Sequence, residues 1–94
     1  MEKKVEIFVS GRVQGVFFRA FILKKARELG LFGWVGNLKD GRVKIVAQGE
    51  KEALEKLIEY AKVGSPLARV SKVNFVWSDD LDKFDDFKVN FSPD

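Results

Sequence analysis

The chain has 94 residues and a formal net charge of +3, and it contains neither cysteine nor histidine. This length predicts a single domain over residues 1–94. The two missing residue types exclude disulfides, thiolate nucleophiles, cysteine-based metal sites and a histidine general base. Any catalysis must therefore rest on carboxylates, amides, cations or the substrate itself.

The N-terminus and the overall charge set further expectations. No long apolar segment follows Lys3 and Lys4, so we expect neither a signal peptide nor a membrane span, and we expect a cytoplasmic location. The mild positive charge favours small anionic ligands and falls short of a nucleic-acid-binding surface. Abundant lysine and glutamate are typical of thermophilic proteins. A chain of this size is expected to be a monomer.

The first elements predicted along the chain are a strand, a loop and a helix. Val5, Ile7 and Val9 alternate with other residues, which predicts a strand that turns these three side chains toward a core. A glycine-bearing loop follows. From about Phe18 to Leu29, apolar residues recur at steps of three and four, which is typical of an amphipathic helix, and Gly30 is placed to cap its end.

The middle of the chain predicts a β-hairpin. Residues 31–48 read as two strands joined by a tight turn at Asp40-Gly41. Gly33 and Gly36 would weaken an ordinary strand, so we expect another part of the chain to pack close against them.

The second half predicts a helix and two further strands. An apolar stripe between Glu50 and Gly64 indicates a helix, and alternation over residues 73–77 indicates a strand. An acidic loop and a short strand over residues 87–91 follow, and residues 92–94 are expected to form a loose tail. The order βαββαβ, with an extra terminal strand, predicts an α+β, ferredoxin-like sandwich. Its mainly antiparallel sheet would carry two helices on one face.

The loop between the first strand and the first helix is the strongest candidate site. A glycine-bearing loop that enters a helix leaves backbone N–H groups unpaired at the positive end of the helix dipole. Arg19 adds a full positive charge and a fork of donors in the first helical turn. This combination predicts a site for an anion such as a phosphate group.

The same loop carries a resemblance to a known family. The run from Gly11 to Arg19 resembles the first acylphosphatase signature, Gly-x-Val-Gln-Gly-Val-x-Phe-Arg. The run from Gly33 to Gly41 resembles the second signature, and Pro66 to Val70 is a weaker third match. The two long signatures stand in the right order and spacing, and the resemblance covers essentially the whole chain.

The resemblance implies an enzyme that hydrolyses the carboxyl–phosphate anhydride bond of acyl phosphates to a carboxylate and phosphate, without a metal or other cofactor. By motif position, Arg19 and loop backbone amides would bind the phosphoryl group, and Asn37 would hold the attacking water. The substrate's own phosphate would accept the proton from that water. The amides expected to bind are those of Gln14, Gly15, Val16, Phe17 and Phe18. Inorganic phosphate is expected as product and competitive inhibitor, with no nucleic-acid or membrane partner.

Two positions depart from the family's pattern. Phe17 fills the variable position of the first signature, where smaller residues are common, and is expected to narrow or shield the mouth of the loop. Ser65 stands where many members have proline, at a position expected to lie far from the chemistry.

Plainer interpretations remain open for each candidate residue. Arg19 could be a solvated helix charge, and Asn37 taken alone is an ordinary polar residue at a strand end. The side chain of Gln14 could be an ordinary amide on the surface of the loop, in which case only the backbone N–H of Gln14 would contribute to the site. The five aspartates of residues 79–86 could form a metal site, although a solvated acidic loop is favoured because a calcium-loop spacing is absent.

Two rival functions also remain. Ferredoxin-like sheets bind single-stranded RNA when aromatic side chains on the open face stack on bases. Phe8 would lie on that face, but the third strand offers no aromatic residue beside it. A phosphate-sensing or carbamoyl-transfer accessory domain with the acylphosphatase shape is the other alternative.

Overall fold

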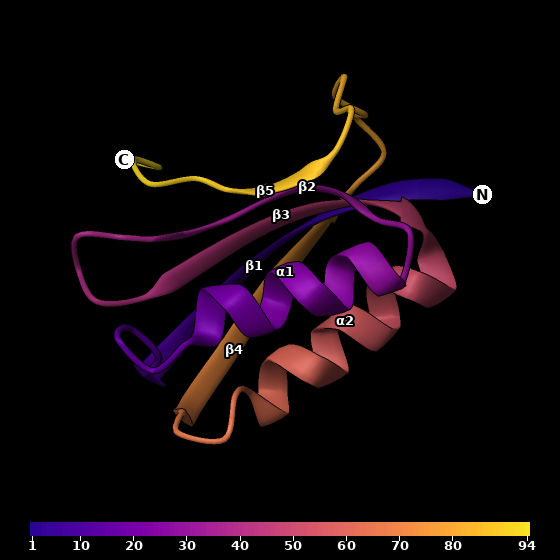
Figure 1. The fold of residues 1–94 in the computed structure, drawn as a ribbon. Coiled ribbons are helices and arrows are strands. Elements are labelled where there is room, and N and C mark those ends of the chain that lie inside the picture. The colour runs from indigo at the N-terminus through magenta and orange to yellow at the C-terminus, as the bar shows by residue number, and fades with distance from the viewer.

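The computed structural model describes residues 1–94 as seven regular elements (Figure 1). In chain order they are β1 (Glu2–Arg12), α1 (Phe18–Glu28), β2 (Phe32–Asn37), β3 (Val43–Glu50), α2 (Lys51–Val63), β4 (Arg69–Ser78) and β5 (Phe87–Val89). Every predicted element is present. The main differences are a longer first strand and a last strand that ends before Phe91. Neither helix has the length and apolar character needed to cross a membrane.

The strands form one sheet in the order β4-β1-β3-β2-β5. All neighbouring strands are antiparallel except β2 and β5, which run parallel. Both helices cover the same face of the sheet (Figure 1): α1 packs against β2 and β5, and α2 packs against β1, β3 and β4. This arrangement confirms the predicted α+β, ferredoxin-like fold with an extra strand.

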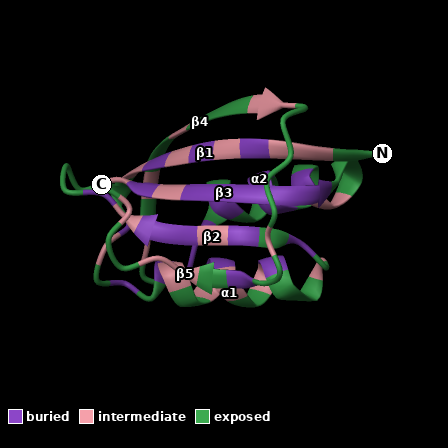
Figure 2. Ribbon diagram, turned by 90° about the horizontal axis from the view of Figure 1, so that it is seen from above, coloured by how far each residue is buried: buried purple, intermediate pink, exposed green.

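The alternation along β1 builds the centre of the hydrophobic core. Val5, Ile7 and Val9 have no exposed surface, and Figure 2 shows buried and partly exposed residues alternating along this strand. They belong to a cluster of 18 buried residues that includes Phe18 and Ile22 of α1. Because fully burying one such side chain contributes about 1.5–3 kcal/mol, this cluster anchors the start of α1, and with it the candidate loop.

The acidic segment between β4 and β5 crosses the other face of the sheet near the N-terminal end of β1 (Figure 2). Gln48 Nε2 donates to the Asp82 carbonyl oxygen at 3.0 Å, and the Asp82 N–H donates to Gln48 Oε1 at 2.8 Å. This cover explains why Gln48, which faces away from the helices, is buried. The segment is a loop, as predicted.

The two glycines of β2 lie under other parts of the backbone, as predicted. A Cβ atom at Gly33 would collide with the Val46 carbonyl oxygen, and a Cβ at Gly36 would collide with the Asn90 carbonyl oxygen. The chain beyond β5 therefore lies on β2. The Lys39 N–H also donates to Asp94 Oδ2 at 3.0 Å. Pro93 lies close to Gly36 as well, so residues 92–94, expected to form a loose tail, make contacts at both of these positions although they form no regular element.

Candidate active site

The loop that joins β1 to α1, residues 13–17, leaves its backbone donors unpaired. None of its N–H groups donates a hydrogen bond to another backbone group or to a side chain of the protein. The first N–H groups of α1 find no carbonyl acceptor within the helix, as at any helix N-terminus. The helical hydrogen bonds start with the one from the Phe21 N–H to the Phe17 carbonyl oxygen (3.1 Å). A row of free donors therefore lies at the positive end of the helix dipole.

The shape of the loop depends on two residues with left-handed backbone conformations. Gly15 has a φ of 72° and Phe17 a φ of 63°. Phe17 is the only non-glycine residue of the chain with a positive φ. Turns of this kind curl successive N–H groups toward a common point and create anion-binding concavities. The side chains of Val13 and Val16 are buried, which fixes the loop from beneath.

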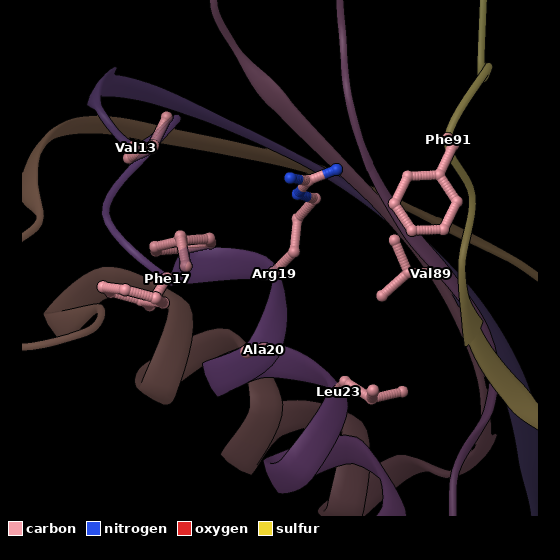
Figure 3. A pocket seen from close by; sticks show the side chains of 9 residues that line it. Val13, Phe17, Arg19, Ala20, Leu23, Val89 and Phe91 are labelled. Atoms are coloured by element: carbon pink, nitrogen blue, oxygen red, sulfur yellow. The ribbon is translucent and has the colours of Figure 1, made fainter.

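Arg19 lies in the first turn of α1 and has no carboxylate partner. It takes part in none of the salt bridges or side-chain hydrogen bonds of the molecule. Its Cζ atom lies 5.5 Å from the centre of the Phe91 ring, so the guanidinium is placed against an aromatic face while its donors remain free. In Figure 3, Arg19 extends from the helix between Phe17 and Val13 on one side and Val89 and Phe91 on the other.

A cavity of about 350 Å³ lies beside this loop. Nine residues line it, and seven of them are apolar, among them Phe17, Leu23, Val89 and Phe91. Gly15, Phe18 and Arg19 of the predicted site also line it, whereas Gln14, Val16 and Asn37 do not. The structure therefore groups Arg19 with part of the loop around one open space.

Asn37 is the last residue of β2, and its side-chain oxygen is left without a partner. The Oδ1 atom is buried and accepts no hydrogen bond within the protein. A buried acceptor left unpaired costs about 1–3 kcal/mol, and such atoms in native proteins call for a specific explanation. A water molecule or a ligand that donates to Oδ1 would supply one.

The side chain of Gln14 connects the two signature regions. Its Nε2 donates to the carbonyl oxygens of Leu38 (2.8 Å) and Arg42 (2.9 Å), which flank the turn of the β2–β3 hairpin. Leu38 directly follows Asn37. The side chain of Gln14 is thus a structural link between the loop and the strand end that carries Asn37. Sequence reasoning left the role of this side chain open.

Ser65 contradicts the expectation that its position is far from the chemistry. Its side chain is buried, and its Oγ donates to the Val16 carbonyl oxygen within the loop at 2.8 Å. Ser65 reaches the loop because it follows the end of α2, where Gly64 packs against the Phe18 ring. Sequence analysis missed this contact because the two partners are 49 residues apart.

Two aspartates of the acidic segment between β4 and β5 pair with lysines of β1. Asp79 and Asp82 form ion pairs with Lys3 and Lys4 at 2.8 and 3.0 Å. No group of three or more acidic side chains is placed to hold a metal ion.

Asp40 is a turn residue, as predicted. The side chain of Arg42 donates to it at 2.8 Å, and this hydrogen bond is the main cause of the lowered pKa of the Asp40 carboxyl. The backbone N–H of Arg42 also donates to it at 3.1 Å and lowers the pKa further.

The open face of the sheet carries aromatic rings with basic side chains beside them. The half-buried ring of Phe8 has Arg42 Cζ 5.1 Å and Lys44 Nζ 5.2 Å from its centre. Lys44 Nζ also lies 5.7 Å from the ring of Trp34, which is half-buried, as sequence reasoning expected for a packing residue. Two aromatic rings and two basic side chains therefore lie together on this face.

Comparison with known proteins shows the family of the chain. The acylphosphatase family model matches residues 5–89. An acylphosphatase of Methanococcoides burtonii is 48% identical over 84 residues, or 89% of this chain and 88% of the relative. An acylphosphatase of Thermus thermophilus is 56% identical over 72 residues, or 77% of this chain and 82% of the relative.

A solved structure supports the same assignment. The crystal structure of acylphosphatase from Bacillus subtilis superposes with a TM-score of 0.92 at 39% identity, over 95% of this chain and 99% of that one. The family match spans both signature runs and all of the regular elements except the start of β1. The chain therefore belongs to the acylphosphatase family of hydrolases.

Proposed function

We propose that this protein hydrolyses acyl phosphates with its own side chains and backbone amides, using Arg19 and the loop to hold the phosphoryl group and Asn37 to orient water. Four features support the proposal: family membership, free N–H groups over residues 13–17, a guanidinium without a carboxylate partner, and a buried unpaired oxygen on Asn37. The single observation that carries it is the row of free donors beside Arg19.

The phosphoryl group would bind where the loop amides of Gln14 to Phe18 and the Arg19 guanidinium converge. Phosphoryl transfer requires mainly positioning and charge stabilisation from the protein. Fixed backbone dipoles meet that need because they do not reorganise during the reaction. A guanidinium can donate to two phosphoryl oxygens at once.

The attacking water would be placed by Asn37. A side-chain amide can accept from water through Oδ1 and donate through Nδ2, but it cannot take a proton at neutral pH. In the proposed step the water oxygen forms a bond to phosphorus. The bond between phosphorus and the acyl oxygen breaks, and its electron pair leaves with the carboxylate. The water proton passes to a phosphoryl oxygen, so the products are a carboxylate and inorganic phosphate.

A hydrolysis assay with acetyl phosphate tests the whole proposal. We expect turnover that a chelator does not reduce and that inorganic phosphate inhibits competitively. Replacing Arg19 by Gln should lower kcat/KM by about 10²–10³, the usual effect of losing one preorganised donor, and should weaken phosphate inhibition. The matched control is Lys24→Gln, which removes an exposed charge from the same helix and should change neither quantity.

A second variant separates the roles of the two side chains. Asn37→Ala should reduce kcat far more than it reduces the affinity for inorganic phosphate, because it removes the partner of the water and leaves the loop intact. Asn74→Ala, an exposed asparagine on β4, is its control. Full activity of Arg19→Gln would refute the phosphate site, and equal losses of kcat and phosphate affinity in Asn37→Ala would assign Asn37 to binding.

A further inference from the structure

The two edges of the sheet differ in length. At one edge, β5 has three residues, and a short edge strand is one way in which proteins limit pairing with other chains. At the other edge, β4 has ten residues, with neither proline nor glycine among them, and it pairs with β1 alone. Figure 2 shows β4 at the margin of the sheet, with no helix or strand beyond it.

The outer side of β4 carries backbone groups without partners. Ser10 pairs with Lys72 and Gly11 with Val70, so Ser71 is an extra residue and the regular part of β4 is residues 72–78. Within such an antiparallel pair, every second residue turns its N–H and C=O away from the neighbouring strand. No hydrogen bond within the protein reaches these outward groups. The outer side is therefore a template for a further strand.

Apolar side chains accompany this edge on both faces of the sheet. Phe75 is 41% exposed on the face that carries the helices, and Val76 is 64% exposed on the other face. On the helix side, a groove of about 270 Å³ lies between α2 and β4, and its walls include Ile58, Phe75 and Trp77. A strand added to the edge would cover this apolar surface.

The charges at the two ends of β4 have opposite signs. The only charged residues of the strand are Arg69 and Lys72, both in its first half, and neither takes part in a salt bridge. Asp79 and Asp80 follow directly after its other end, and Asp80 also has no cationic partner. A second β4 in the antiparallel direction would bring opposite charges together, whereas a parallel one would bring like charges together.

We propose that residues 72–78 pair antiparallel with the same residues of a second copy of this chain, so that the two sheets join into one. Because residues opposite each other in a strand pair share a face of the sheet, a symmetric pair is centred on one residue. Centring the pair on Phe75 aligns the whole regular part of β4 in both copies. Lys72 then lies opposite Ser78 and diagonal to Asp80 of the second copy, within reach of a long side chain.

The same register covers the apolar side chains of the edge. The Phe75 rings of the two copies meet at the twofold axis, and Trp77 lies opposite Val73 of the second copy on the helix side. Pairs of two aromatic side chains, or of an aromatic and a β-branched one, stabilise neighbouring strands. Because a single strand pair buries little area, we expect a weak dimer with a dissociation constant between about 1 µM and 1 mM.

Sedimentation equilibrium between about 1 µM and 1 mM chain tests the proposal. We expect the average mass to rise from that of one chain to that of two chains and no further, because the pair occupies the β4 edge of both copies. Lys72→Glu and Asp80→Lys each place like charges together at two symmetric positions, and each should raise the dissociation constant about tenfold. The control is Lys24→Glu, which reverses an exposed charge on α1 and should leave the constant unchanged.

An equimolar mixture of Lys72→Glu and Asp80→Lys makes the test specific for this register. In the mixed dimer, the introduced glutamate of one chain faces the introduced lysine of the other, and the unchanged Lys72 faces the unchanged Asp80. The mixture should therefore dimerise with a constant within about threefold of that of the unmodified chain. An unmodified chain that keeps the mass of one copy up to about 1 mM, or a mixture that associates no more tightly than its components, would overturn the proposal.

Discussion

Ser65 offers a sharp test of how the fold positions the loop. Its Oγ donates to the Val16 carbonyl oxygen at 2.8 Å, and that oxygen accepts no backbone hydrogen bond. The Val16 carbonyl and the Phe17 N–H belong to one planar peptide group and point in opposite directions. Fixing the carbonyl toward Ser65 therefore turns the Phe17 N–H away from Ser65, as the proposed phosphate site requires.

The Ser65→Ala variant should weaken both stability and binding. It leaves a buried carbonyl without a donor, which costs about 1–3 kcal/mol. With an unfolding entropy of about 0.2 kcal/mol/K for a chain of 94 residues, the melting temperature should fall by about 5–15 °C. Because the Phe17 N–H can then rotate away, the inhibition constant of inorganic phosphate should rise about tenfold, less than the loss of a whole preorganised donor would cause.

Circular dichroism melts and phosphate inhibition of acetyl phosphate hydrolysis measure the two effects. Ser71→Ala removes an exposed hydroxyl from β4 and is the matched control, for which we expect no change in either quantity. A Ser65→Ala protein that melts within about 1 °C of the unmodified chain would refute the energetic argument. One that loses stability but binds phosphate with unchanged affinity would refute the link through the peptide plane.

Three further predictions follow from other contacts. Gly33→Ala should lower the free energy of unfolding by about 3 kcal/mol or more in a urea titration, because its Cβ would collide with the Val46 carbonyl oxygen; an unchanged midpoint would contradict the packing. Gln14→Glu should lose about 1–3 kcal/mol by the same measurement, since a carboxylate cannot donate to the two carbonyls that Nε2 now contacts. The activity should vary little between about pH 5 and 8. A steep step in activity between these two pH values would contradict this expectation. The hydrogen bond from Arg42 keeps the pKa of Asp40 below its usual value. The contribution of this bond to stability is therefore lost only as the pH falls through that lowered pKa.

The elements of the fold and the candidate loop could be predicted because their signals are local. Alternation placed Val5 and its neighbours in the core, and a glycine loop before a helix with Arg19 in its first turn indicated an anion site. The contacts of Ser65 and Phe91 could not be predicted in this way. They join residues far apart in the sequence, and hydrophobic periodicity does not specify which strand edges and helix ends meet.

The buried Gln48 shows the same limit on the other face of the sheet. Its strand alternates cleanly, so its position predicts an exposed side chain. The loop that crosses this face covers Gln48 and supplies hydrogen-bond partners from Asp82. Sequence reasoning placed the acidic loop correctly but gave no information on where its chain passes.

The strained backbone of Phe17 reduces the stability of the protein without ligand, and the free N–H groups of the loop have no partner within the protein. If the loop is kept in this form for phosphate, inorganic phosphate must raise the melting temperature. Binding stabilises a protein by about 2.7 kcal/mol when the ligand is at 100 times its Kd. With the same unfolding entropy as above, the expected increase is about 13 °C. Sodium chloride at equal ionic strength controls for screening, and Arg19→Gln should abolish most of the increase. An equal increase in that variant would mean that phosphate acts as a general salt and that the loop is not its site.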